Sequence, residues 1–414
     1  MTLSVLETSE EFAPATAAEL ERFLGENAQN LKKPVYPVGG RTALHYGYPL
    51  REPGVVVATA GLSRVIDYPA RDMTVTVEAG IRMEQLAELL GQERQRLPID
   101  IPQLHRATLG GVLATNTNGP RRYGYGTLRD YVIGISAIDG RGNIFHAGGR
   151  VVKNVAGYDL CKLMIGSLGT LAVVTQVTLK LRPTLETSAW LWCSYPSWPQ
   201  LDAALERLTT TQTRPVALVA LNARAAQQIV GEIHVSAAAE SPTLAIALEG
   251  TQKETSWQLN CLKDELAQTV PSEMHDIPDD HVDAVWTAFT EYPAVTDEPL
   301  TFRANVLPSR AVGFMEQADA AGISVMSHAG NGIVIGHFPD DWINFDKLQP
   351  ALGRLSHLAQ ECGGNLVVLQ CPDEWKPKLS LWGQPESGFA LMQKLKSAFD
   401  PDGLLNPHRF FAAT

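Results

Sequence analysis

The sequence lacks the cysteine patterns that hold iron–sulfur clusters or structural zinc. Its 414 residues include only five cysteines, and none of them belongs to a C-x-x-C pair. Ferredoxin-type clusters and zinc ribbons need closely spaced thiolates. If electrons leave this protein through an iron–sulfur cluster, another chain therefore holds that cluster. We interpret the cysteines as small buried apolar residues; they are Cys161, Cys193, Cys261, Cys362 and Cys371.

Long apolar runs and an excess of positive charge are also absent. No segment approaches the roughly 18 apolar residues of a membrane-spanning helix, and residues 1–7 lack the basic start and apolar core of a signal peptide. Lysine and arginine total 34 against 45 aspartate and glutamate, so the formal charge is −11. Acidic chains are poor nucleic-acid binders. We therefore expect a cytoplasmic protein with no transmembrane segment and no nucleic-acid partner.

The composition is that of a folded globular protein. Hydrophobic residues make up 45% of the chain, charged residues 19%, and the mean hydropathy is −0.06. Such a chain can bury a sizeable core, and its length predicts two or three domains. The clearest strand runs from Leu171 to Leu181, where apolar and polar residues alternate until Pro183.

Other patterns predict an α+β protein. Beyond Pro183, strands and helices alternate as in one α+β domain of about 150 residues. Ser309 is a plausible helix N-cap, and Gly322 follows the predicted helix end. Strands are predicted at 55–58, 73–78, 133–137, 189–192, 215–221, 244–248, 302–307, 323–326, 333–335 and 366–369. Further helices are predicted near 201–208, up to Leu266, at 352–362 and at 388–398.

Five clusters of glycine and other small residues follow one another in the first half of the chain. In the first, Gly39 and Gly40 follow a short strand and can expose successive N–H groups to a diphosphate. Arg41 adds a positive charge and Thr42 a hydroxyl. Walker A and Rossmann fingerprints are both absent. A plain glycine turn explains any single cluster, but packing does not readily explain all five in order, at 37–44, 107–116, 119–127, 149–160 and 165–171.

This ordered set resembles the FAD-binding oxidoreductases of the vanillyl-alcohol oxidase, or PCMH-type, superfamily. The segments that carry the resemblance are 39–42, 74–80, 108–111, 153–160 and 166–171, and the tail 399–407 is similar to the superfamily's closing signature. Within the superfamily, residues 149–160 with Arg121 and Arg122 ahead of them are most similar to the E subunits of bacterial glycolate oxidases.

The resemblance implies a fold and a function. It implies an α+β protein with a two-lobed FAD-binding domain at 1–184, an α+β cap domain at 185–342 and a C-terminal segment at 343–414 that completes the cap and the FAD site. The chain would be the FAD-binding subunit of a glycolate oxidase or dehydrogenase complex, which oxidises a small 2-hydroxy acid to the 2-oxo acid by hydride transfer to flavin. Its partners would be a sister catalytic flavoprotein and an iron–sulfur subunit, and any peripheral membrane association would run through that complex. A non-catalytic structural or electron-relay subunit is the alternative.

The resemblance also implies which residues contact FAD. The loop 39–42 would hold the diphosphate, and segments 108–116 and 166–172 would line the flavin and adenosine portions. Some superfamily members bond flavin to a histidine of the first loop, but this loop has none and His45 is out of register, so we expect non-covalent FAD. The expected contacts are Val38, Gly39, Gly40, Arg41, Thr42, Thr108, Leu109, Gly110, Gly111, Thr115, Asn116, Gly119, Tyr123, Gly124, Gly166, Gly169, Thr170, Ala172 and Asn406.

Two chemical motifs of the related 2-hydroxy-acid dehydrogenases are incomplete here. Their metal motif, H-x-G-D-G-N-x-H, corresponds to residues 328–335, where Asn331 replaces the carboxylate and Ile335 the second histidine. His337 lies two residues later, on the same face of a strand, so a displaced ligand stays open; we expect no metal. The general-base motif E-H-G-x-G corresponds to 367–374, which contains no histidine. Catalytic residues therefore stay unassigned.

Three residues are candidates for substrate contact. Arg303 could receive a carboxylate through its planar guanidinium, although an exposed strand arginine is the alternative. Tyr158 could pair with Asp159 near the flavin or simply fix a loop. His328 is either a substrate contact or an ordinary polar residue of a glycine hairpin. The aromatic segment 375–383 could meet a partner subunit or fold back on its own domain.

Overall fold

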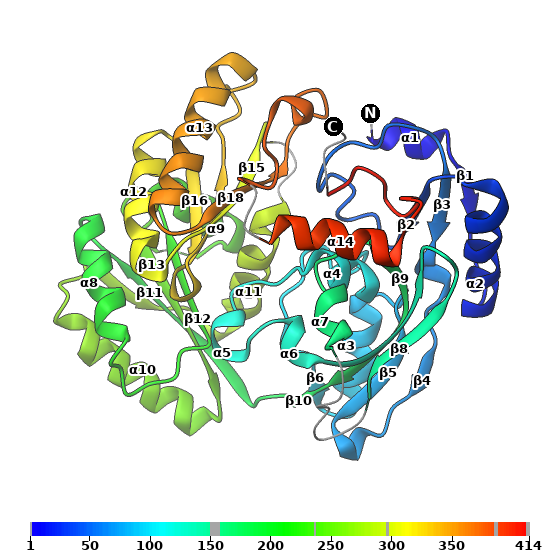
Figure 1. Ribbon diagram of the computed structural model, residues 1–414. Coiled ribbons are helices and arrows are strands. Elements are labelled where there is room, and N and C mark those ends of the chain that lie inside the picture. The colour runs from blue at the N-terminus through cyan, green and yellow to red at the C-terminus, as the bar shows by residue number, and fades with distance from the viewer. Residues whose placement is uncertain (1, 150–157, 236, 295–297, 385–387, 411–414) are drawn as a thin grey trace.

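The computed structural model describes residues 2–149, 158–235, 237–294, 298–384 and 388–410. Two sheet-centred bodies lie side by side, the N-terminal one in blue to cyan and the central one in green to orange (Figure 1). Helices and strands alternate throughout, which confirms the α+β class. None of the helices in the described part of the chain combines the length and apolar character of a membrane span.

The N-terminal body begins with a small parallel sheet in the order β1-β3-β2. Buried valines at positions 35 and 55–57 explain these short strands, because a parallel sheet is covered on both faces. Thr16 caps α2 by accepting the N–H of Glu19. The elements are α1 (Thr2–Glu7), β1 (Glu10–Phe12), α2 (Ala17–Glu26), β2 (Val35–Val38) and β3 (Val55–Ala58).

The second lobe is an antiparallel sheet in the order β4-β5-β9-β7-β8. The predicted alternation of 171–181 is confirmed: Val173, Thr175, Val177 and Leu179 of β9 are buried, while Lys180 is exposed. The strands are β4 (Val65–Asp67), β5 (Thr74–Glu78), β7 (Val132–Asp139), β8 (Ile144–Gly148) and β9 (Ala172–Lys180). The helices of this lobe are α3 (Met83–Gln92), α4 (Leu109–Thr115), α5 (Arg122–Tyr125), α6 (Leu128–Tyr131) and α7 (Leu160–Met164).

A short antiparallel pair, β6 (Gln95–Arg96) with β10 (Arg182–Pro183), leads into the central body. That body is one eight-stranded antiparallel sheet in the order β14-β11-β13-β12-β16-β17-β15-β18. Side chains alternate across it, since Leu191 packs on one face and its neighbour Trp192 on the other. Its strands are β11 (Thr187–Ser194), β12 (Ala217–Leu221), β13 (Thr243–Gly250), β14 (Glu273–Asp276), β15 (Thr301–Asn305), β16 (Ser324–His328), β17 (Ile333–His337) and β18 (Asn365–Gln370).

Helices cover both faces of the eight-stranded sheet. One face packs against α8 (Trp198–Leu208), α10 (Gln252–Ala267), α12 (Ala311–Ala320) and α13 (Phe345–Glu361). The other packs against α9 (Ala223–Ile233) and α11 (Val282–Glu291). Strand β18, from the segment 343–414 that we expect to complete the cap, belongs to this sheet; the three domain boundaries themselves stay predictions.

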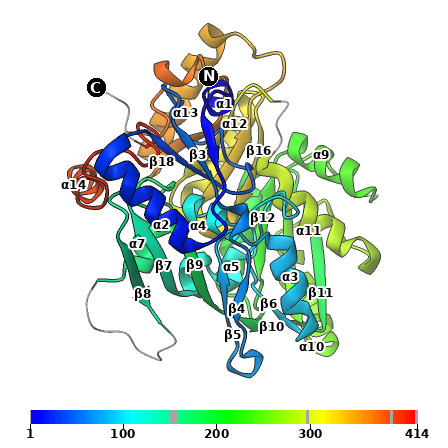
Figure 2. The same ribbon diagram turned by 90° about the vertical axis from the view of Figure 1, so that its right-hand side faces the viewer.

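After β18 the chain returns to the N-terminal body. Helix α14 (Phe389–Phe399) lies on the opposite side of the molecule from α9 and α11 (Figure 2). Lys396 of α14 donates to the carbonyl of Thr170, and Leu405 forms an isolated parallel bridge with Val35 of β2. The tail therefore packs beside the glycine-rich loops, as the resemblance implied.

Two helix starts differ from the sequence-based expectation. Ser309 is not an N-cap: it lies in a 3-10 turn at Pro308–Arg310, and α12 begins after Arg310. The helix predicted at 352–362 begins at Phe345, because Asn344 caps it by accepting the N–H of Asp346. The sequence predicts segment 107–116 only as a cluster of small residues, but the segment contains the buried helix α4.

Candidate functional site

Three adjoining cavities lie along the first glycine loop. The loop cavity, about 650 Å³, is lined by residues 36–44 together with Gly111, Ala114, Thr115, Leu168, Asn406 and others. It shares Thr42, Tyr46 and Thr115 with an inner cavity of about 850 Å³, which extends to the central body. It shares Pro37, Gly39 and Ala114 with an outer cavity of about 480 Å³ beside β9. The three cavities therefore adjoin one another along this loop.

Close backbone approach explains the two glycines of the first loop. A Cβ on Gly40 would lie 1.8 Å from the carbonyl oxygen of Arg106, and one on Gly39 would lie 2.0 Å from the Oγ1 of Thr108. No side chain fits at either position. Arg41 has a left-handed φ of 58° and its guanidinium pairs with Glu11 at 3.3 Å, at the surface.

Helix α4 forms the floor next to this loop. Thr108 caps it by accepting the N–H of Gly111, and Leu109 is fully buried beneath it. Gly111 lines all three cavities, and Gly110 lines the outer one. Thr115 faces the loop and inner cavities, and its hydroxyl contacts the Thr117 hydroxyl at 2.6 Å. Asn116 ends the helix with a φ of 53°, and its Oδ1 has no hydrogen-bond partner among the described residues.

The segments around residue 170 and the tail complete the outer end. Gly169 and Ala172 line the outer cavity. Asn406 donates from its amide to the carbonyl of Leu168 and lines the loop cavity. Gly166 and Thr170 instead line a separate apolar groove beneath α14, together with Met392.

The FAD contacts predicted in the third small-residue cluster, residues 119–127, lie outside the three cavities. Gly119, Tyr123 and Gly124 are not among the residues that line the three cavities. A Cβ on Gly124 would be 2.7 Å from the Cα of Val216, and the ring of Tyr123 packs on Gly330 of the central body. Gly119 lies against Asp100. The structure places this cluster between the two bodies, so its contact with FAD stays a prediction.

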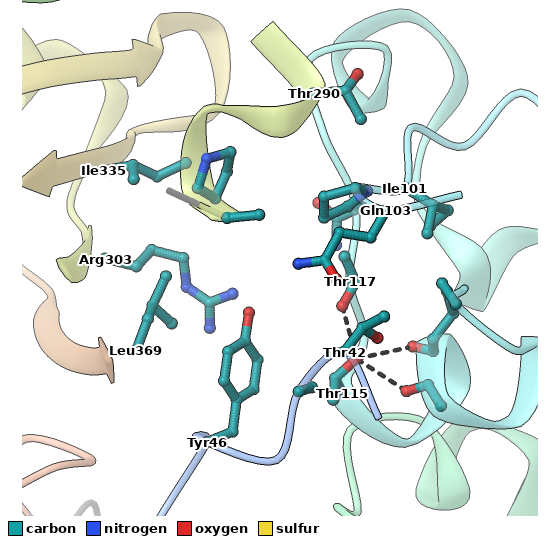
Figure 3. A pocket seen from close by; sticks show the side chains of 18 of the residues that line it. Thr42, Tyr46, Ile101, Gln103, Thr115, Thr117, Thr290, Arg303, Ile335 and Leu369 are labelled. Atoms are coloured by element: carbon teal, nitrogen blue, oxygen red, sulfur yellow. Dashed lines mark hydrogen bonds between the residues drawn. The ribbon is translucent and has the colours of Figure 1, made fainter. Parts of the chain in front are cut away.

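The inner cavity receives residues from both bodies. In Figure 3 the guanidinium of Arg303 and the ring of Tyr46 point toward one another, with Gln103, Thr42 and Thr115 on the facing wall. Its lining includes two arginines, Arg122 and Arg303, and no aspartate or glutamate among the described residues. Such a cavity attracts an anion.

Neither arginine has an ion-pair partner in the described part of the chain, and the Nε of each lacks a hydrogen-bond partner. Burial lowers the pKa of Arg303. Burial and the neighbouring charge of Arg303 together lower the pKa of Arg122, whose Nη1 donates to Asn118 at 2.8 Å. Two adjacent, desolvated guanidinium groups are a ready receptor for a carboxylate. Arg303 is therefore a partly buried residue that lines the cavity rather than an exposed strand arginine.

Strand pairing brings Arg303 and His328 together. In β17, Ile335 is the register partner of Arg303 on β15, and Ile333 is the partner of His328 on β16. All four residues line the inner cavity. The two polar side chains thus lie on one face of the sheet, two positions apart along β17.

His337 does not join His328 in a metal site. It lies at the other end of β17, where one ring nitrogen contacts the Thr301 hydroxyl at 3.0 Å and the other the carbonyl of Tyr292 at 2.9 Å. Both nitrogens are therefore engaged in the core. No cluster of three or more histidine, cysteine, aspartate or glutamate side chains suits a metal in the described ranges.

The remaining predicted contacts have different outcomes. Tyr158 is 95% exposed and does not line the inner cavity. Residues 150–157, which include most of the fourth cluster, lie outside the described residues. Where relatives carry the base histidine, β18 contributes only Leu369 to the inner cavity. Segment 375–383 folds back on its own chain, since Trp375 and Leu381 are buried in the core.

Sequence reasoning missed Tyr46, Gln103 and the role of Arg122. Lys376 donates to the carbonyl of His45, and Arg409 donates to the carbonyls of Tyr48 and Leu44, so the tail fixes the loop that carries Tyr46. Arg121 and Arg122 are adjacent, and both support the resemblance. Nothing in the sequence showed which of the two arginines faces the cavity.

Comparisons with known proteins agree with this geometry. Residues 11–148 match the family model described as FAD binding domain, and residues 381–410 match that of FAD linked oxidases, C-terminal domain. Glycolate oxidase subunit GlcD of Bacillus subtilis is 26% identical over 97% of this chain and 88% of its own length. A D-lactate dehydrogenase of Archaeoglobus fulgidus is 27% identical over 95% of this chain and 89% of its own.

Solved structures show the same fold. P-cresol methylhydroxylase with substrate bound has a TM-score of 0.73 at 13% identity, covering 96% of this chain and 88% of its own. Alkyldihydroxyacetonephosphate synthase has a TM-score of 0.65 at 16% identity, covering 96% of this chain and 75% of its own. The residues fit an FAD, because the glycine loop and α4 leave a space that any side chain at Gly39 or Gly40 would disrupt. The chain therefore contains the FAD binding domain and the C-terminal domain of the FAD linked oxidases, is an FAD-linked oxidoreductase, and has the fold of p-cresol methylhydroxylase.

Proposed function

We propose that this chain oxidises a small 2-hydroxy acid to the 2-oxo acid in the inner cavity. The observation that carries the proposal is the pair Arg122 and Arg303, which are partly buried and face the cavity without a carboxylate partner among the described residues. The names of the relatives, a glycolate oxidase subunit, D-lactate dehydrogenases and D-2-hydroxyglutarate dehydrogenases, share this substrate class.

The chain's own residues bind and orient the substrate. Arg303 and Arg122 hold the carboxylate, and Tyr46 and Gln103 offer hydrogen bonds to its oxygens. Val38 to Thr42, Gly110, Gly111, Thr115, Gly169, Ala172 and Asn406 line the space for a non-covalent FAD. When bound, FAD supplies the acceptor for the hydride of the carbinol carbon. Arg122 and Arg303 thereby fix the distance of that carbon from the cofactor space.

The proposed setting is a glycolate oxidase complex with a sister flavoprotein and an iron–sulfur subunit. The relative's name, glycolate oxidase subunit, supports an assembly. The chain has no C-x-x-C cysteine pair, so the cluster would lie on another chain. A non-catalytic FAD subunit is the second candidate, favoured by the absence of histidine in segment 367–374.

Anaerobic addition of glycolate or D-lactate to the yellow protein tests the proposal. We expect the flavin absorbance to bleach, and Arg303→Met to lower kcat/KM for that reduction about 10- to 100-fold, as expected for a lost charged hydrogen bond. Arg310→Met, at an exposed arginine of the 3-10 turn before α12, is the matched control and should leave the rate unchanged. Flavin that is bound but unbleached by every 2-hydroxy acid tried would instead support the non-catalytic candidate.

A further inference from the structure

His328 is a buried histidine whose ring has no hydrogen-bond partner. It ends β16, is 2% exposed and lines the inner cavity. Neither Nδ1 nor Nε2 has a partner among the described residues. A buried polar group without a partner costs free energy unless a ligand or water completes it. The ring is therefore available to a molecule in the cavity.

The groups that face His328 keep it neutral. Burial lowers its pKa to about 3, and the charges of Arg122 on α5 and Arg303 on β15 act in the same direction. The other titratable side chains of the cavity are Tyr46 and His45, and burial leaves both uncharged near neutral pH by raising the pKa of the first and lowering that of the second to about 4. A neutral imidazole has one nitrogen that can accept a proton.

The other histidine of this hairpin provides a contrast. His337 is equally buried, at 2% exposure, but both of its nitrogens have partners within the core. Burial alone therefore does not leave a histidine unpaired in this fold. What distinguishes His328 is that it faces the same space as the two arginines.

We infer that His328 is the catalytic base that accepts the proton of the substrate hydroxyl while Arg122 and Arg303 hold its carboxylate. The inference rests on the proposed function and assigns the role that segment 367–374 leaves open. The O–H bond breaks and its proton passes to a free ring nitrogen of His328. The C–H bond of the carbinol carbon breaks and its hydride, with both electrons, passes to FAD, and the carbon–oxygen double bond forms.

Substrate binding makes this base effective. In the empty cavity two positive charges oppose protonation of His328. A bound carboxylate offsets those charges and raises the affinity of the imidazole for a proton. The base therefore gains strength only when an acid substrate is present, which discriminates against uncharged alcohols.

The test compares His328→Gln with wild-type protein and with His357→Gln, an exposed control on α13. We expect His328→Gln to slow anaerobic flavin reduction about 10²- to 10⁴-fold, as for loss of a general base. Binding of oxamate, a carboxylate without an oxidisable carbinol, should change less than about threefold. Arg303→Met should instead weaken oxamate binding, because it removes a guanidinium that holds the carboxylate.

A second readout does not depend on activity. In ¹³C-histidine-labelled protein, the resonance missing from His328→Gln identifies His328, and its titration midpoint should rise when oxamate is added. A midpoint that oxamate does not move, or a His328→Gln protein that reduces its flavin at the wild-type rate, overturns the inference and leaves the proposed function standing. Wild-type flavin that no 2-hydroxy acid reduces overturns the proposed function, and the assignment of the base with it.

Discussion

The two sides of the inner cavity are lined by different kinds of chemical group. On the N-terminal side, the loop 37–44 and α4 present backbone and small side chains, although Tyr46 and Arg122 of the same body also line the cavity. On the side of the central body, β15 and β16 present Arg303 and His328. A wall of backbone atoms and small side chains selects a ligand by its shape. A wall of ionisable side chains selects a ligand by its charge and can accept or donate protons. The first wall therefore suits a cofactor and the second a substrate.

This contrast predicts unequal responses to substitution. On the wall formed by the loop 37–44 and α4, which we call the glycine wall, a methyl group at Gly40 collides with main-chain atoms that cannot give way, so the expected loss there is total. On the opposite wall, a substitution removes one charge or one hydrogen bond, and the loss is graded. The contacts that hold the two bodies together should lie between these extremes.

The largest expected effect is that of Gly40→Ala. The new Cβ would lie 1.8 Å from the carbonyl oxygen of Arg106, so the loop must move away from residues 106–107, which precede α4, and the cofactor space changes shape. We expect purified Gly40→Ala protein to be colourless and to gain no flavin absorbance when FAD is added.

Gly91→Ala is the matched control for this change. Gly91 lies in α3, and a Cβ there meets nothing within 4 Å. This variant should retain a full equivalent of FAD. A yellow Gly40→Ala protein with normal FAD content would contradict the idea that backbone packing forms this wall.

A smaller loss is expected at the junction of the two bodies. The carboxylate of Glu249, on β13, accepts from Arg96 at 2.6 Å, from Arg121 at 2.9 Å and from the hydroxyl of Tyr125 at 2.8 Å, and its side chain is 2% exposed. Glu249→Gln removes the carboxylate partner of Arg96 and one of the two carboxylate partners of Arg121, which keeps its ion pair with Asp100 at 2.6 Å. We expect the free energy of unfolding in urea to fall by about 3 kcal/mol.

Glu254→Gln, at an exposed position of α10, is the control and should change that free energy by less than about 0.5 kcal/mol. Glu249→Gln protein should still bind FAD below the unfolding transition, because its partners lie outside the glycine wall. Equal stability of the two variants would show that Glu249 does not hold the bodies together.

The smallest effect expected of a single residue is the loss of stability in acid that each buried histidine contributes. Burial lowers the pKa of His45 and His337 to about 4 and that of His328 to about 3. Below the unfolded value near 6.5, the unfolded chain binds protons that the folded chain excludes, so stability is complete above that pH and falls as the pH decreases. Each histidine contributes about 1.4 kcal/mol per pH unit in that range.

Urea unfolding between pH 7 and pH 5 measures this slope. His337→Gln should reduce the slope of the unfolding free energy against pH by the equivalent of one bound proton. His357→Gln, at an exposed residue, should not reduce it. A slope that is the same in wild-type and His337→Gln proteins would contradict the neutral state of His337.

The local pattern of the chain predicted most of its elements. Alternating residues predicted β9, because a half-buried sheet face imposes a period of two, and consecutive valines predicted β3, which is buried on both faces; the structure confirms both strands. Caps were less predictable: Ser309 has the right chemistry for an N-cap, but a 3-10 turn displaces the start of α12 to Ala311. Helix α4 was missed because its glycines obscure a helical pattern.

By itself, the sequence indicated that this protein binds FAD, because the ordered glycine clusters carry a resemblance to FAD-binding oxidoreductases that can be read along the chain. Only the tertiary structure decided what faces the cofactor space. Tyr46, Arg122, Arg303 and His328 are distant in sequence, and the pairing of β15 and β16 with β17, together with the packing of the two bodies, brings them into one cavity. Their chemistry depends on shared burial and on mutual charge, and neither can be read from spacing along the chain.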